Sequence, residues 1–449
     1  MSVTFTASNQ RTTAVWLELD GVPRASGSGR LNAGETRQIQ GQAGQTWVAR
    51  GPWEHDGIVA VYEPTDRVPT WSILEPSTGL PEELERFNNG FYSESLATPQ
   101  EFLRPDQVLK TIFLFVDFSD APAAGASWSD EARIIQRISG GADRWLQDTS
   151  FGQSGLTVAR QAGWRRMPKP ATAYSDALCR CLSGSAREYL EDVAALFAGD
   201  VDFSLYDFLC VVAAKTASLD LSPAWSGLPP EGPIPTANHP ISHAITFGAD
   251  SYDSQTDHRL LLHEALHLCG LPDLYDGGSV EGAGKANFSS KLVGPWDLMA
   301  DHQETHHLLG WHRLKLGWLH RSQVLTHFGG GQFEIELTDW TKEDGIHCLM
   351  VPLQPSPVET GNSEIDAHNA KVSRAYLIEP APGGGVLVYS VDASVPTWEC
   401  PIQIRGDKSE VRLPGLIQPG KTYRHLSSGL AVEVLQETQD GCRVAVSAN

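Results

Sequence analysis

Residues 257–276 have the sequence DHRLLLHEALHLCGLPDLYD, and this stretch decides both the fold and the chemistry. Two histidines, His263 and His267, lie four positions apart among leucines and an alanine. Residues four apart share one face of a helix, one turn above the other. The stretch therefore predicts a largely buried helix that presents two imidazoles side by side.

Two imidazoles at this spacing can bind one Zn²⁺ through their ring nitrogens. Glu264 directly follows the first histidine, so its carboxylate is expected beside the metal rather than on it. A general base must lie there to take a proton from a metal-activated water. We therefore expect His263 and His267 as zinc ligands and Glu264 as the catalytic base.

The end of this helix predicts the third ligand. Gly270 stands where a helix ends with a residue in the left-handed conformation, and Pro272 cannot extend the helix. The chain reversal would bring the carboxylate of Asp273 to the metal and leave a fourth position for water. The sequence therefore predicts one zinc ion per chain, with Asp273, or a histidine near residue 302, as third ligand.

Several polar residues that follow are candidates for supporting roles. His302, His306 and His307 could line the cleft, bind a transition-state oxyanion or replace Asp273 on the metal. Asp276 could orient the loop or a ligand histidine. For each of them an ordinary surface or supporting position is the competing interpretation.

The extended pattern H-E-x-x-H-x-x-G-x-x-D resembles the metzincin-type zinc peptidases, in particular the immune inhibitor A family, whose motif ends in Asp. Other stretches are similar to that family in the same order, and together they cover roughly residues 108–400: 110–120 (KTIFLFVDFSD), 202–207 (DFSLYD), 294–300 (GPWDLMA), 311–318 (WHRLKLGW), 376–379 (YLIE) and 385–392 (GVLVYSVD). The resemblance implies that Met299 forms a Met-turn, an apolar floor beneath the histidines.

A second resemblance concerns residues 15–62, which are similar to the β domain of the von Hippel Lindau tumour suppressor. The shared signals include WLELDG at 16–21, HDG at 55–57 and Trp47. In that family the domain binds a hydroxyproline peptide, but of the residues in that pocket only Trp47 matches here. Trp47 has two interpretations, a place in the sandwich core or exposure at a strand edge, where it is a candidate to bind a protein partner.

The distribution of sequence patterns along the chain predicts a multidomain α+β protein. Short alternating runs indicate strands at both ends, and strands alternate with helical patterns between them. We expect an N-terminal β-sandwich (1–66), a proline-rich linker (67–107), an α/β metzincin-like zinc peptidase domain (108–328) and a C-terminal β-sandwich (329–449). The proline-rich stretch could also wrap the catalytic domain.

Charge and composition narrow the possible partners. The chain has 34 Lys and Arg against 55 Asp and Glu, a net charge of −21, which disfavours nucleic acid as a partner. There is no apolar run of roughly 18 residues, so no membrane span is expected, and the opening residues lack the pattern of a signal peptide. The seven cysteines are odd in number and sparse, which is not typical of a disulfide framework.

These features favour a zinc-dependent endopeptidase that acts on a protein or peptide substrate. A binding or adhesion protein with a structural or inert metal site is the rival class, and Glu264 speaks against it because a structural site needs no base. A metallohydrolase that processes one small or modified peptide would share the same chemistry.

Overall fold

The structure is a computed structural model of the chain. It describes residues 2–9, 15–19, 29–42, 47–50, 58–62, 70–73, 84, 92–174, 185–217, 219, 222–253, 257–275, 292–303, 307–327, 331–352, 374–397, 399–405, 415–425 and 429–448. These residues form a mixed α/β protein with many strands in several sheets and few helices. The sequence patterns predicted this general class. Across these ranges, no helix is long and apolar enough to cross a membrane.

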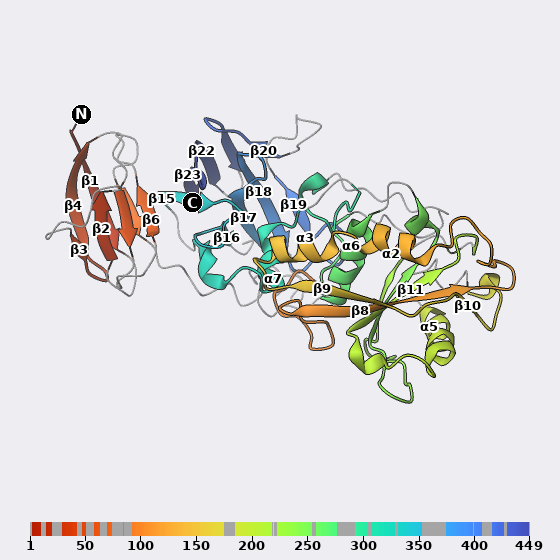
Figure 1. Ribbon diagram of the computed structural model, residues 1–449. Helices are drawn as coiled ribbons and strands as arrows, with labels where there is room; N and C mark the ends of the chain where they lie inside the picture. The colour runs from red at the N-terminus through yellow and green to blue at the C-terminus, as the bar shows by residue number, and fades with distance from the viewer. Residues whose placement is uncertain are drawn as a thin grey trace, which may run out of the picture.

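The N-terminal part forms two small sheets, drawn in red and orange in Figure 1. One has the order β4-β1-β7 and the other β3-β2-β5-β6, and apolar side chains from both sheets share one core. The strands are β1 (Ser2–Asn9), β2 (Val15–Leu19), β3 (Arg30–Leu31), β4 (Thr36–Gln42), β5 (Trp47–Arg50), β6 (Ile58–Tyr62) and β7 (Thr70–Ile73).

The expected boundary at residue 66 was wrong. The strand β7 lies within the expected linker but pairs in parallel with β1, so the N-terminal sheets extend beyond residue 66. This error arises because strand pairing, which the local pattern does not specify, decides which strands share a sheet. Of the two interpretations of Trp47, a place in the core describes it. Trp47 lies in β5, which is flanked by β2 and β6, and it packs half-buried against the local core.

The central part is a six-stranded sheet with the order β10-β8-β11-β13-β12, in which β9 also pairs with β8. All pairs are parallel except that of β12 with β13, so β12 is an antiparallel strand at one end of the sheet. The strands are β8 (Val108–Asp117), β9 (Gly155–Arg160), β10 (Arg165–Arg166), β11 (Phe208–Ala213), β12 (Ala224–Ser226) and β13 (His243–Phe247).

Helices cover both faces of the central sheet, with α2, α3 and α6 on one face and α5 on the other (Figure 1). Strand β8 is apolar on successive residues because a parallel strand is buried on both faces. The helices are α2 (Glu131–Ser139), α3 (Ala142–Thr149), α5 (Ser185–Phe197), α6 (His258–Leu268) and α7 (Gly310–Lys315), with short 3₁₀ turns η1 (Ala171–Ala173), η2 (Phe203–Leu205), η3 (Ala249–Tyr252), η4 (Gly294–Trp296) and η5 (Arg321–Gln323).

The C-terminal part contains two further sheets that share a core. One has the order β14-β16-β17-β18-β19 with β20 beside β18, and the other β15-β23-β22-β21. The strands are β14 (Val324–Thr326), β15 (Gly331–Thr338), β16 (Cys348–Pro352), β17 (Arg374–Pro380), β18 (Val386–Asp392), β19 (Ile402–Ile404), β20 (Leu416–Ile417), β21 (Thr422–His425), β22 (Leu430–Thr438) and β23 (Gly441–Ala448).

The expected boundary at residue 328 is also displaced. Strand β14 precedes it but pairs with β16, so the C-terminal sheet begins by Val324. The face of that sheet opposite the second C-terminal sheet belongs to the same hydrophobic cluster as α6, through side chains such as Met350 and Leu377. The central and C-terminal parts are therefore packed on one continuous core.

The final stretch of the expected linker packs against the central part. The amide of Leu103 donates to the carbonyl of Leu268, at 2.8 Å, and the indole of Trp318 donates to the carbonyl of Pro105, at 2.9 Å. Residues 93–95 are buried. Of the two predicted arrangements for this stretch, the wrapped one describes residues 92–105.

Candidate metal centre

Helix α6 is buried as its sequence predicts, and its first turn is capped. The carboxylate of Asp257 caps the first turn by accepting from the amide of Arg259, at 2.9 Å. The leucines of the helix are buried against the central sheet. Since this apolar surface fixes the rotation of the helix, His263 and His267 are held on one side of it.

The helix ends at Gly270, which has a φ of +90° and therefore the predicted left-handed conformation. The amide of Gly270 donates to the carbonyl of His267 and that of Leu271 to the carbonyl of Leu266, at 2.9 and 3.1 Å. This pair of hydrogen bonds is the Schellman pattern, which reverses the chain after a helix. The reversal places Asp273 opposite the two histidines.

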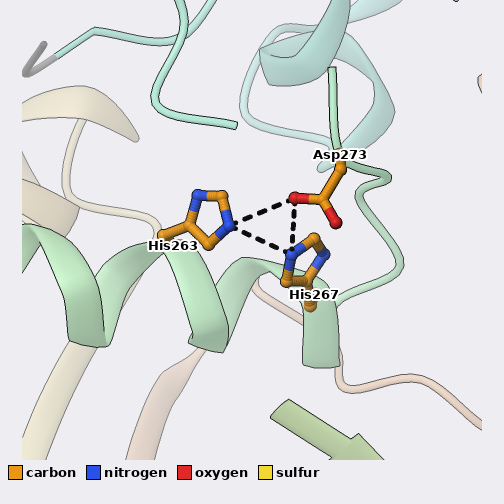
Figure 2. Close-up of side chains that lie close together, drawn as sticks. All are labelled: His263, His267 and Asp273. Atoms are coloured by element: carbon orange, nitrogen blue, oxygen red, sulfur yellow. Dashed lines mark hydrogen bonds and ion pairs between the residues drawn. The ribbon is translucent and has the colours of Figure 1, made fainter. Parts of the chain in front are cut away.

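The side chains of His263, His267 and Asp273 point toward one another (Figure 2). Oδ1 of Asp273 is 3.2 Å from Nε2 of His263 and 3.1 Å from Nε2 of His267. The two Nε2 atoms are 3.2 Å apart. Three potential ligand atoms from two segments thus form a nearly equilateral triangle.

This triangle fits a zinc ion. Ligands at roughly 2.0–2.1 Å from a tetrahedral zinc ion lie about 3.3 Å from one another. The observed separations of 3.1–3.2 Å are close to that value. Two imidazoles and one carboxylate also match the ligand chemistry of catalytic zinc sites, which leave the fourth position open.

Backbone carbonyls orient both imidazoles. Nδ1 of His263 lies 3.0 Å from the carbonyl oxygen of Leu298, and Nδ1 of His267 lies 2.7 Å from that of Leu271. A carbonyl can only accept, so each Nδ1 carries a proton and Nε2 is the ring nitrogen that faces the triangle. A metal ligand needs this orientation, because the metal takes the place of any proton on Nε2.

Asp273, the third residue of the triangle, is held from the C-terminal part of the chain. The amide of Asp273 donates to Oγ1 of Thr397, at 3.0 Å. The next amide, that of Leu274, donates to the carbonyl of Met299, also at 3.0 Å. Met299 itself is fully buried in the cluster that contains α6, a position that fits both a Met-turn and an ordinary core methionine.

The electrostatics of the triangle favour a cation. Burial alone would raise the pKa of Asp273, but the two facing imidazoles hold that pKa well below its usual range. Burial alone would lower the pKa of His267, but the carboxylate of Asp273 raises that pKa to about 9. The carboxylate is therefore ionised and attracts positive charge at the point where the three atoms meet.

Glu264 lies beside the triangle on the same helix. Its Oε2 atom accepts from the amide of Ala224 in β12, at 2.7 Å. Burial raises the pKa of this carboxyl, with a smaller contribution from Asp273, while the two histidines lower it. A half-buried carboxyl with a raised pKa is suited to accept and return a proton near neutral pH.

Tyr92 is a residue of the site that the sequence did not indicate. Its ring lies edge-on to His267, with centroids 5.9 Å apart, and against Phe102 at 5.1 Å. Burial raises the pKa of Tyr92 to about 12, with contributions from the nearby Glu264. The phenol is therefore a neutral hydrogen-bond donor beside the triangle, and it comes from a proline-rich stretch without periodicity, where no pattern pointed to it.

The other predicted residues have different outcomes. His302 lies beside His263, with ring centroids 5.2 Å apart, but the converging set consists of His263, His267 and Asp273 in the described part of the chain. Burial lowers the pKa of His302 to about 4, so it is neutral. His307 packs against Trp340. Asp276 and His306 lie outside the described residues.

Comparison with protein-family models gives no match for this chain, and comparison with curated proteins gives none either. The interpretation of the site therefore depends on its geometry.

Proposed function

We propose that the protein is a zinc-dependent endopeptidase. The observation that carries this proposal is the triangle formed by His263, His267 and Asp273, with Glu264 beside it on the same helix. A metal site with a purely structural role has no use for a carboxylate in that position. The resemblance of the extended motif to metzincin-type peptidases of the immune inhibitor A family agrees with this proposal.

A bound zinc ion would supply a Lewis acid for a peptide carbonyl and would lower the pKa of water to about 7. Glu264 takes the proton from the attacking water and passes it to the leaving amine. The amide of Ala224 limits the rotation of the Glu264 carboxylate by donating to Oε2. We assign the exchange of the proton to the other oxygen, Oε1.

Strand β12 supports a peptide as the substrate. It is the terminal strand of the central sheet, and its Ala224 contacts the proposed base directly. An extended peptide can add to such an edge through backbone hydrogen bonds. A substrate bound in this way would have its backbone alongside Glu264.

We further propose that the central part is a metzincin-like domain between two β-sandwiches. The N-terminal pair of sheets shares one core, and so does the C-terminal pair. The N-terminal pair supports the proposed resemblance to the von Hippel Lindau β domain in class of fold. A protein partner of that module remains a proposal separate from the chemistry.

The decisive test is the variant Glu264→Gln, assayed on a peptide library together with the wild type. The amide oxygen of Gln can still accept from Ala224, so the fold and metal content should persist while the base is lost. We expect hydrolysis to fall by about 10²–10⁴-fold at unchanged zinc content.

Three other results would each point elsewhere. Equal activity in the variant would place the base on another residue. A zinc-loaded wild type that cleaves no member of the library would favour the rival class, a binding protein with an inert metal site. Cleavage confined to one short or modified peptide would favour a peptide-processing hydrolase.

A further inference from the structure

The turn at residues 297–299 supports two of the three proposed metal ligands. The carbonyl of Leu298 lies 3.0 Å from Nδ1 of His263, which donates to it. The next carbonyl, that of Met299, accepts from the amide of Leu274, beside Asp273. Any movement of this turn is therefore transmitted to His263 and Asp273 together.

Asp297 holds this turn in place. Its Oδ1 atom accepts from the amide of Met299 at 2.8 Å, and its Oδ2 atom accepts from the amide of Leu309 at 2.9 Å. The side chain is completely buried. The turn thus depends on the position of one buried carboxylate.

His312 of α7 connects Asp297 to a second buried carboxylate. Nδ1 of His312 lies 2.9 Å from Oδ2 of Asp297, and Nε2 lies 3.1 Å from Oε1 of Glu94. Burial alone would lower the pKa of His312, but these two carboxylates raise it to about 10. A buried imidazolium therefore bridges Asp297 and Glu94.

Glu94 belongs to the stretch before the central sheet, and each of its carboxylate oxygens has a hydrogen-bond partner. Its Oε2 atom accepts from the indole of Trp311, at 2.9 Å. The ammonium group of Lys315 donates to the carbonyls of Ser93, at 2.7 Å, and Ser95, so both neighbours of Glu94 are held as well. The carboxylate has little freedom to move or to be replaced by water.

We propose that Glu94 is a positioning residue of the metal centre, which acts through His312 and Asp297 on the turn that orients His263 and Asp273. The inference rests on the metal centre of the proposed function and extends it to a residue outside the central sheet. Each contact in the sequence Glu94, His312, Asp297 is short, buried and between charged groups. Removal of a residue that orients a metal ligand through hydrogen bonds typically lowers metal affinity or activity by about 10–100-fold.

Burial of these charges argues for a positional role. Ion pairs in a protein interior often stabilise no more than apolar residues of similar volume, because desolvation offsets the attraction. Such ion pairs instead fix the orientation of the side chains, since each carboxylate oxygen accepts a hydrogen bond from a defined donor. In this cluster the donors are the imidazolium, the Trp311 indole and the two amides that anchor the turn.

The test is zinc affinity of the full chain, measured by competition with a chelator, for the wild type, Glu94→Gln and Glu94→Ala. Gln keeps one acceptor oxygen and should retain most of the affinity, whereas Ala should weaken zinc binding by about 10–100-fold. With Co²⁺ in place of zinc, the visible spectrum of Glu94→Ala should shift, because the ligand geometry changes. Asp117→Asn is the matched control, since Asp117 is a buried carboxylate that contacts Arg166 and the amide of Ala123.

A double-mutant cycle with His312→Asn completes the test. If Glu94 acts through His312, the losses of zinc affinity in the two single variants will not add in the double variant. Additive losses, or a Glu94→Ala variant that loses stability like the control but binds zinc like the wild type, would overturn the inference. Should Glu94→Ala not fold, the cycle is run with Glu94→Asp, whose shorter side chain does not reach His312, and its loss of zinc affinity should likewise not add to that of His312→Asn.

These outcomes are distinct from those of the peptidase proposal, because no readout here depends on hydrolysis. A wild type that binds zinc but cleaves nothing leaves the positioning role intact. A wild type that binds no zinc overturns both.

Discussion

Each donor atom of the proposed metal centre is held by a second contact of the same residue. His263 and His267 are held through their Nδ1 atoms, and Asp273 is held through its own amide. Such contacts reduce the conformational freedom that metal binding would otherwise have to remove. The side chains are therefore arranged as ligands by the protein itself.

At this scale we predict that His263→Ala loses zinc, because it removes one of three protein ligands. Metal analysis of the purified variant measures the loss directly. His302→Ala is the control, since His302 lies beside His263 but outside the converging set. Zinc that persists in His263→Ala but disappears in His302→Ala would reassign the ligands.

At the scale of elements, the end of α6 and the helix α7 position the proposed ligands and the residues that contact them. Gly270 turns the chain so that Asp273 faces the helix that precedes it. Helix α7 carries His312 between two buried carboxylates. Both elements position groups that lie outside them.

Gly270→Ala should destabilise the protein and weaken zinc binding. A left-handed conformation costs a residue with a side chain about 1–2 kcal/mol, and an added Cβ would lie 3.1 Å from Thr98 and 3.2 Å from Phe102. Gly163→Ala is the matched control, because Gly163 has a φ of +95° with no atom within 4 Å of an added Cβ. Denaturant unfolding and zinc titration compare the two variants. An equal loss of stability with unchanged zinc affinity in both would show that the turn tolerates the substitution.

The His312 cluster predicts a pH dependence of stability. Burial lowers the pKa of His312, but the carboxylates of Asp297 and Glu94 raise it by more, from 6.5 to about 10. The protonated His312 therefore stabilises the folded state fully below pH 6.5, its pKa in the unfolded chain. This contribution is lost as the pH rises toward about 10, its pKa in the folded protein. Between pH 7 and 9.5 the free energy of unfolding should fall by up to about 1.4 kcal/mol per pH unit from this group. Denaturant unfolding of the wild type and His312→Gln, compared across that range, isolates the contribution, and identical slopes would contradict it.

At the scale of the whole molecule, the chain before the central sheet and the chain after it both contribute contacts to the proposed metal centre. Tyr92, which precedes the central sheet in the chain, lies against His267, and Thr397, which follows that sheet, accepts from the amide of Asp273. Strand β15 of the C-terminal part lies beside β6 and β7 of the N-terminal sheets. The proposed peptidase domain is therefore not confined to residues 108–328.

A chain that starts at residue 107 should accordingly bind zinc at least about tenfold more weakly than the full chain, because it lacks Glu94 and Tyr92. A chain that starts at residue 80 retains these residues and Leu84, which is fully buried, and should bind zinc like the full chain. Zinc competition and circular dichroism of both chains test this. Equal affinity in the two would show that the central part is independent of residues 80–106.

The local features of the site could be predicted from the sequence. The spacing of His263 and His267, the apolar face of α6 and the left-handed Gly270 depend on residues within one or two helical turns, where periodicity and backbone sterics leave few alternatives. The same holds for the buried strand β8, whose apolar run has one explanation in a parallel sheet. The general class, mixed α/β with sheets at both ends, followed from these patterns.

The supports of the site depended on the tertiary structure. The contacts of His263 with Leu298, Glu264 with Ala224, Asp273 with Thr397 and His312 with Glu94 span 35, 40, 124 and 218 positions. A carbonyl, amide or carboxylate can pair with many partners, and only the packing of distant segments selects one. For the same reason β7 and β14 were assigned to the wrong parts, since the identity of a strand's neighbour is set by global pairing. The sequence by itself thus determined which side chains carry the proposed chemistry, because their spacing is local, and only the tertiary structure decided what holds them in place.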